Sequence, residues 1–147
     1  MSRSRRAPRY ASRQAALQVL FALDLAPAGG SVDEVFERVS DNFDLPEGAR
    51  AFAKQLVCGV IGEREAIDAT LASLAHNWRL PRMAVVDRNV LRLGAYEILH
   101  TDTPAAVAID QAVALARRFG AEGSAGFVNG VLDAVARASG RAQDRPG

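Results

Sequence analysis

Arginines at the start of the chain are the first residues whose type and spacing suggest a chemistry. Five of them precede the first acidic residue, Asp24, although the net charge of the whole chain is only +1: Arg3, Arg5, Arg6, Arg9 and Arg13. Guanidinium groups make bidentate contacts to phosphate and stack on unpaired bases, as arginine-rich segments do when they fold on RNA. Because lysine occurs once, a general preference for arginine explains part of the cluster, and a solvated tail is the alternative. The segment predicts RNA binding.

A glycine-rich segment at residues 120–130 invites comparison with phosphate-binding loops. It has no lysine after its last glycine, and no strand is predicted before it, so both nucleotide-binding patterns are excluded. The preferred interpretation is that one helix ends at the first glycine and the next helix begins a few residues later. Arg117 and Arg118 directly precede the segment, and they favour a phosphate contact there.

Side chains that catalyse reactions or bind metals are not arranged in any pattern that we recognise. The chain has one cysteine and two histidines far apart, His76 and His100, so no zinc spacing is present. No nucleophile has a base in a known context. Cys58 is expected to pack in an apolar helix stripe, and the carboxylates are expected to be solvated. We therefore predict no catalytic residue, no metal, no cofactor and no enzymatic activity.

Between Trp78 and Leu99, arginines and acids lie on a strongly apolar helical segment, with Arg88 and Arg92 four residues apart. Local ion pairing on the surface of a core helix is the simplest explanation. Trp78 and Tyr96 are expected to be core residues rather than binding surfaces.

Helical elements must position these residues, because apolar side chains recur at three- and four-residue intervals and no run alternates like a strand. A capping box formed by Ser31 and Glu34 starts one helix, while Pro46 and Pro104 suit first turns. The predicted fold class is all-α, with about seven helices in one compact body or two small bundles. The expected helices are residues 13–25, 31–44, 46–62, 63–77, 82–100, 104–120 and 124–138.

Domain organisation follows from charge and polarity along the chain. We expect a basic flexible arm at residues 1–12, a helical domain at 13–138 and a disordered tail at 139–147. The apolar stretch from Ala15 to Ala26 is too short to span a bilayer, and no good signal peptide is present. With a single cysteine, a reducing, cytoplasmic setting fits best.

An ordered set of short motifs covers nearly the whole chain. The motifs are Arg13 with Ala16, Gln18, Leu20 and Phe21; Asp87-Arg88, Leu91-Arg92-Leu93 and Tyr96-Glu97; Pro104 with Val107, Ala108 and Ile109; and Phe119-Gly120 leading to Phe127-Val128-Asn129-Gly130-Val131-Leu132-Asp133. Each fragment alone is weak, but their order and spacing together make chance similarity improbable. The set resembles the NusB family of transcription antitermination factors.

The resemblance implies a NusB-like fold of two small helical bundles and a factor that pairs with NusE, a small-subunit ribosomal protein, to bind boxA RNA. The pair would help to load an antitermination complex on RNA polymerase, notably during ribosomal RNA synthesis. The RNA-binding residues implied are Arg5, Arg6, Arg9, Arg13, Gln18 and Phe127, to which Arg118 is added from the glycine-rich segment; Phe21 and Asp87 would lie on the NusE side.

Some positions depart from the family pattern. Phe21 stands where many members have a tyrosine-like residue, so it offers the partner no hydroxyl, and Asp110-Gln111 replaces a more usual Asn-Glu pair. Gly123 and Gly126 occupy positions that are often polar, which affects the RNA contact near Phe127.

Two alternatives stay open at this point. One is a helical homodimer that acts as a scaffold without RNA binding. The other is an isolated N-terminal domain of a ribosomal RNA cytosine methyltransferase, because that family shares the fold. The methyltransferase requires a further domain for its methyl donor, whereas the helices account for most of this sequence.

Overall fold

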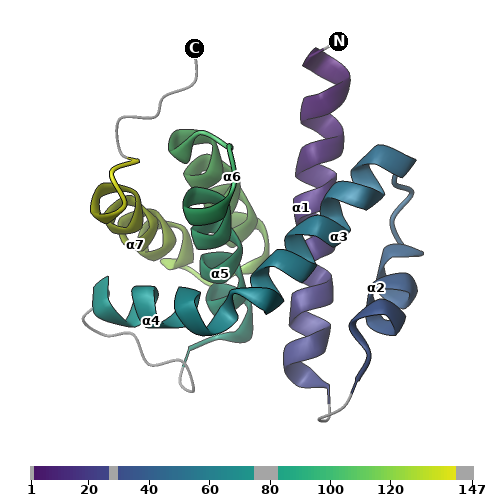
Figure 1. Cartoon of the computed structure of the whole chain (residues 1–147), viewed down its shortest axis with the longest axis horizontal. Coiled ribbons are helices and arrows are strands. Elements are labelled where there is room, and N and C mark those ends of the chain that lie inside the picture. The colour runs from purple at the N-terminus through teal and green to yellow at the C-terminus, as the bar shows by residue number, and fades with distance from the viewer. Residues whose placement is uncertain (1, 27–29, 75–82, 142–147) are drawn as a thin grey trace. The chain divides into compact units, whose positions relative to one another are not determined.

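The computed structural model describes residues 2–26, 30–74 and 83–141, and for residues 2–8 it describes the backbone alone. In those residues it has seven helices and no strand, which confirms the all-α prediction. The helices are α1 (Ser2–Leu25), α2 (Val32–Ser40), α3 (Glu47–Gly62), α4 (Arg64–Leu74), α5 (Val85–His100), α6 (Ala105–Phe119) and α7 (Ser124–Ala138), shown in Figure 1. The chain forms two compact units, Met1–Ile61 and Gly62–Gly147, here called the N-terminal and C-terminal units.

The N-terminal unit is built from α1, α2 and α3, whose apolar faces are buried. Leu17 of α1, Phe36 of α2 and Leu56 of α3 are each at most 1% exposed. A buried hydrogen bond joins α1 to α3, because the Ser12 hydroxyl donates to the Ala49 carbonyl over 2.8 Å. This bond fixes the register of the two helices where they cross (Figure 1).

Helix α1 begins earlier than its apolar pattern predicts. The expected start at Arg13 is wrong, since α1 runs from Ser2, and residues 2–12 continue the helix where a flexible arm was predicted. Arginine and alanine are strong helix formers, so this stretch is helical without an apolar stripe. Pro8 removes only one backbone hydrogen bond. The arginines are therefore carried on a helix with regular spacing.

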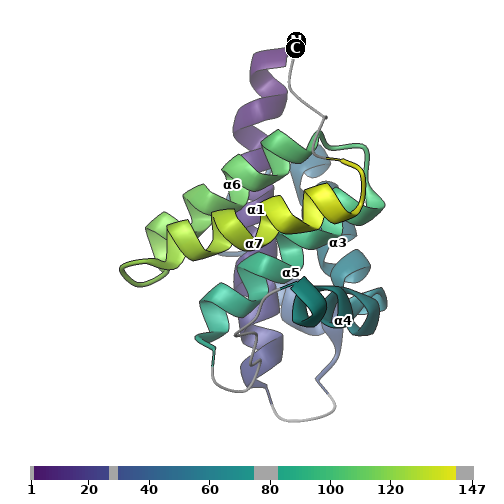
Figure 2. The ribbon, with the colours of Figure 1, turned by 90° about the vertical axis from the view of Figure 1, so that its left-hand side faces the viewer.

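In the C-terminal unit α5 is the central helix. Every residue from Asn89 to Ile98 is buried, and α6 and α7 run side by side across α5 (Figure 2). The approach is close at Gly94, where a Cβ atom would lie 2.5 Å from Cδ1 of Leu132 and 3.3 Å from Cβ of Ala112. A larger residue at this position would therefore force the Leu132 side chain of α7 to move.

The remaining helix boundaries differ from the predictions by a few residues. The Ser31 side chain caps α2 by accepting the backbone N–H of Glu34, as the capping box predicts, but α2 ends at Ser40 rather than near residue 44. The start of α5 is at Val85. Residues 75–82, where the fourth predicted helix ends and the fifth begins, lie outside the described residues.

The prediction that Cys58 packs in an apolar stripe was wrong. Cys58 is exposed, because the buried stripe of α3 follows Ala53, Leu56 and Val60, and Cys58 faces away from it. Residues 139–141 of the expected tail are placed against the C-terminal unit through hydrogen bonds of Arg141, whereas residues 142–147 lie outside the described residues. No described helix is long and apolar enough to cross a membrane.

Candidate nucleic-acid interface

Two of the predicted RNA-binding arginines converge on one aromatic ring. The guanidinium carbon of Arg9 lies 4.6 Å from the centroid of the Phe52 ring, and that of Arg13 lies 5.5 Å from it. The two arginines are four residues apart and therefore lie on one face of α1, while Phe52 comes from α3. This guanidinium–aromatic cluster of Arg9, Arg13 and Phe52 is the main cationic feature of the described N-terminal unit.

Exposure separates the two arginines of this cluster. Arg9 is exposed, whereas Arg13 is 3% exposed. The Phe52 ring is half-buried and lies under both cations. The sequence analysis placed Arg9 in a flexible arm, so it did not predict that Arg9 and Arg13 share a helix face. Nothing in the sequence identifies the aromatic residue that meets this face.

The other predicted residues of the N-terminal unit also lie on α1. Gln18 and Phe21 are half-buried, and so each has surface that a ligand or partner can reach. Arg5 and Arg6 lie on the helical backbone of α1, and their side chains are outside the described residues.

In the C-terminal unit the predicted residues flank the turn between α6 and α7. Arg118 is exposed, with its guanidinium carbon 5.3 Å from the centroid of the Phe119 ring, and Phe127 on α7 is 36% exposed. Gly123 precedes α7 with a φ of 89°, a conformation that favours glycine. As predicted, the glycines end one helix and begin the next. Arg117 and Arg118 also suit the negative end of the α6 dipole.

Asp87, predicted to face the protein partner, makes a contact inside its own unit. Its Oδ2 accepts a hydrogen bond from the Ser124 hydroxyl over 3.1 Å, and Ser124 Oγ in turn accepts the backbone N–H of Ala121 over 3.0 Å. Oδ1 of Asp87 is buried and accepts no hydrogen bond from the described residues. Asp87 thus ties α5 to the α6–α7 turn.

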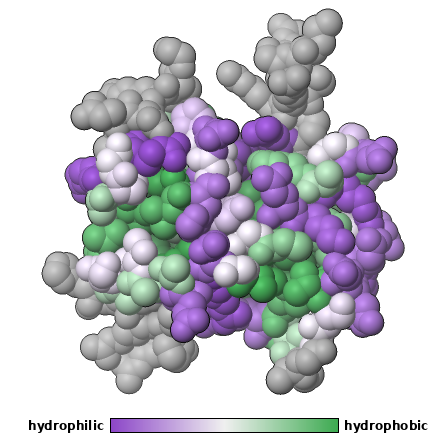
Figure 3. Space-filling model, viewed as in Figure 1, coloured by the Kyte–Doolittle hydropathy of each residue, from purple (hydrophilic) through white to green (hydrophobic). Residues whose placement is uncertain are grey.

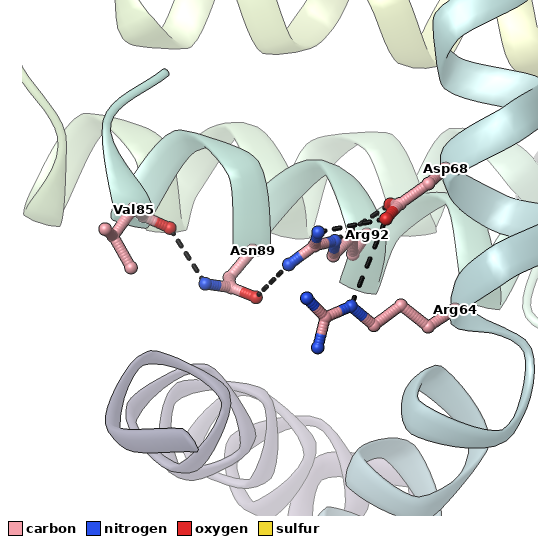
Figure 4. Close-up of polar contacts among 5 residues, drawn as sticks. All are labelled: Arg64, Asp68, Val85, Asn89 and Arg92. Atoms are coloured by element: carbon pink, nitrogen blue, oxygen red, sulfur yellow. Dashed lines mark hydrogen bonds and ion pairs between the residues drawn. The ribbon is translucent and has the colours of Figure 1, made fainter. Parts of the chain in front are cut away.

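Arg92 shows how an arginine is used for structure rather than for binding. Its guanidinium forms two hydrogen bonds to the Asp68 carboxylate, over 2.9 and 3.0 Å, and a third to Asn89 Oδ1 over 3.3 Å (Figure 4). Arg92 is 3% exposed, so the expectation of a surface ion pair was wrong. The residue that pairs with Arg92 comes from α4, which periodicity within α5 does not reveal.

Ion pairs also cover the surface of the N-terminal unit where α2 faces α3. Lys54 lies 3.0 Å from the Asp33 carboxylate, and Arg50 pairs with Glu37. Hydrophilic side chains occupy this edge in Figure 3. The hydrogen bond to Asp33, and then the charge of Asp33, raise the pKa of Lys54 above its ordinary value. These cations are paired with carboxylates, which distinguishes them from Arg9.

Among the described residues, no group of three His, Cys, Asp or Glu side chains is placed to hold a metal ion. The surfaces that remain as candidates are therefore the guanidinium–aromatic cluster in one unit and the α6–α7 turn in the other.

Comparison with protein families decides which class of protein carries these surfaces. A family model described as the NusB family matches residues 10–137. The chain belongs to the NusB family. A transcription antitermination protein NusB of Sorangium cellulosum is 49% identical over 138 residues, which cover 90% of this chain and 94% of that protein. The relatives that match over most of their length are named transcription antitermination proteins, and this confirms the prediction that the chain is not an enzyme.

Solved structures of the family share the fold. The structure of T. maritima NusB matches with a TM-score of 0.80 and 35% identity, covering 88% of this chain and 90% of that one. A second structure, of the antitermination factors NusB and NusE in complex with dsRNA, matches with a TM-score of 0.80 and 29% identity, covering 90% of this chain and 98% of that one.

Proposed function

We propose that this NusB-family protein binds boxA RNA together with the ribosomal protein NusE, as part of an antitermination complex on RNA polymerase that acts notably in ribosomal RNA synthesis. The observation that carries the proposal is the exposed Arg9 held over Phe52 on a helix that also carries Arg5 and Arg6. A factor that acts on nascent bacterial RNA works in the cytoplasm, so that location is part of the proposal.

The chemistry of α1 supports an RNA ligand. Arg5, Arg6 and Arg9 add three positive charges within about one helical turn, and the first 23 residues contain no acid. A guanidinium matches the geometry of phosphate oxygens and stacks on bases. Such contacts fix the position of an RNA strand but select sequence weakly. We therefore expect NusE to add contact area and sequence choice.

Individual residues have different parts in this proposal. Arg9 contacts phosphate directly, and Gln18 extends the contact along α1. Arg118 and Phe127 contribute from the α6–α7 turn, where an exposed guanidinium and an exposed ring offer phosphate and base contacts. Arg13 is only 3% exposed, so it offers an RNA strand little surface of its own.

The proposed NusE side is less polar. Phe21 offers half-buried apolar surface, while Oδ2 of Asp87 already accepts a hydrogen bond from Ser124. We expect Phe21 to contact the partner directly and Asp87 to contribute from its own unit, where it holds the α6–α7 turn. In the alternative, a homodimer of the free protein, the same apolar surface would contact a second copy of the chain.

The test is a titration of fluorescent RNA with the whole chain at two salt concentrations, with and without NusE. Three probes are compared: single-stranded boxA RNA, a scrambled strand, and a duplex, since a related protein was solved with NusE and dsRNA. The R5A/R6A/R9A variant removes three charges from α1. The matched control, R38A/R137A, removes exposed arginines from α2 and α7.

The expected result is a preference for boxA that NusE strengthens and that R5A/R6A/R9A removes, with the control unchanged. The slope of log affinity against log salt should fall by about 0.7 for each single-strand phosphate that the variant no longer neutralises. Equal binding of boxA and scrambled RNA, with no effect of NusE, would contradict the proposal. Light scattering of the free protein then tests the homodimeric scaffold.

A further inference from the structure

Phe52 is a half-buried aromatic residue on α3 that no sequence motif assigns to a function. Its ring lies under two guanidinium groups from α1, at 4.6 Å for Arg9 and 5.5 Å for Arg13. A ring this close to two cations is within the range at which cation–π attraction is significant.

Electrostatics explains why the ring matters to this pair of arginines. Like charges four residues apart on a helix repel each other, and such pairs destabilise the helix slightly. The negative face of an aromatic ring attracts both cations, so Phe52 offsets the repulsion between Arg9 and Arg13. The ring does this without neutralising Arg9, whereas a carboxylate would offset the charge that attracts phosphate.

Geometry gives the ring a second effect. A guanidinium that lies over a ring uses its flat face for that contact, while its N–H groups point outward in its plane. Those in-plane N–H groups are the ones that bind phosphate oxygens in a bidentate manner. Arg9 is exposed, so its N–H groups are accessible to a ligand.

A second aromatic residue of the same unit shows the contrasting arrangement. Phe36 lies under Arg50 and Lys54, at 5.6 and 5.8 Å, but these cations also pair with Glu37 and Asp33. In the part of the chain that the structure describes, no carboxylate pairs with Arg9. The Phe36 cations are used inside the fold, whereas the Phe52 cluster keeps an exposed cation.

We infer that Phe52 is a positioning residue for RNA binding: its ring holds the Arg9 guanidinium over α3, where the N–H groups stay accessible to an RNA phosphate. This inference rests on the proposed function, because it assigns a role within the same RNA-binding surface. Preorganising a long side chain lowers the entropy cost of binding.

The experiment is a double-mutant cycle with single-stranded boxA RNA as the probe and the full chain as the protein. Phe52→Leu keeps an apolar side chain but removes the ring, and we expect about two- to fivefold weaker binding. Phe52→Tyr keeps the ring and should bind like the parent. Phe43→Leu is the matched control, because Phe43 is a half-buried ring with no described cation over it.

The cycle separates positioning from a merely structural role. In an Arg9→Ala background, Phe52→Leu should have no further effect on affinity, because the side chain that the ring orients is gone. A loss of affinity of the same size in both backgrounds, or none in the parent, would overturn the inference. Thermal unfolding of each variant shows whether it folds. If Phe52→Leu does not fold, Phe52→Tyr is used for the test. Weaker binding by a folded Phe52→Tyr variant would also count against positioning.

Failure of the inference and failure of the proposed function have different signatures. If the parent chain binds boxA RNA and Arg9→Ala weakens it while Phe52→Leu does not, only the positioning role is wrong. If neither the parent nor any variant binds RNA, the proposed function itself is wrong.

Discussion

Arg9 in the N-terminal unit and Arg92 in the C-terminal unit are the same amino acid in opposite settings. Arg92 is buried, and its N–H groups donate to the Asp68 carboxylate and to Asn89 (Figure 4). Arg9 is exposed, and its guanidinium lies over the Phe52 ring. A carboxylate uses the edge of a guanidinium, whereas a ring uses its face. The residue that meets an arginine therefore decides whether it stabilises the fold or remains able to bind.

The largest effect that this comparison predicts is on stability. Arg92→Ala leaves the partly buried Asp68 carboxylate without its main cation, and we expect the free energy of unfolding to fall by about 3 kcal/mol. Urea unfolding followed by circular dichroism measures it. Arg137→Ala breaks the exposed Arg137–Asp133 pair and should cost less than about 0.5 kcal/mol. If the two variants were equally stable, the distinction between a buried and an exposed arginine would fail.

A smaller loss is expected at Arg141, which lies beyond α7. Its guanidinium donates to the backbone carbonyls of Ile98, Thr101 and Thr103, which lie at or just after the end of α5, where carbonyls lack helical partners. Arg141→Ala should lower the free energy of unfolding by about 1–2 kcal/mol. Arg141→Lys should recover only part of this loss, because an ammonium cannot reproduce the planar arrangement of donors. A fully stable alanine variant would show that residues after α7 contribute nothing to the fold.

The exposed arginine should affect binding and not stability. Arg9→Ala is expected to weaken binding of boxA RNA and to reduce the salt slope by about 0.7, the value for one single-strand phosphate contact. The variant and the parent should unfold at nearly the same temperature, because a surface substitution usually changes the free energy of unfolding by less than about 0.5 kcal/mol. An unchanged salt slope would mean that Arg9 makes no phosphate contact.

The smallest effect concerns the exposed pair of Lys54 and Asp33. The pKa of Lys54 is raised above 10.5 by the hydrogen bond to Asp33 and by its charge. Because the folded pKa is the higher one, the pair stabilises the fold fully below pH 10.5, and this contribution disappears as the pH rises through the folded pKa.

Nuclear magnetic resonance can test this shift directly, since Lys54 is the only lysine in the chain. Asp33→Asn should move the titration of Lys54 down toward 10.5. The difference in stability between the parent and the variant should disappear as the pH rises through the folded pKa of Lys54. A titration that is the same in both proteins would show that the pair has no influence in solution.

The sequence alone determined the helical class and most helix positions. Apolar spacing, the Ser31 cap and the glycines at 120 and 123 are local signals, and local hydrogen bonding decides where a helix forms. The same signals missed the start of α1, because arginine and alanine favour a helix without producing an apolar stripe. The clustering of arginines before Asp24 is also a local signal, since it is visible in the order of the residues alone.

Only the tertiary structure decided what each arginine does. The partners of Arg9, Arg92 and Arg141 are Phe52 on α3, Asp68 on α4 and the carbonyls at the end of α5, all of them distant in the sequence. No helical period connects residues on different helices, so the pairing arises only when the helices pack. Contact with a ring, a carboxylate or a row of carbonyls then determines whether the N–H groups are used inside the protein or left for a ligand.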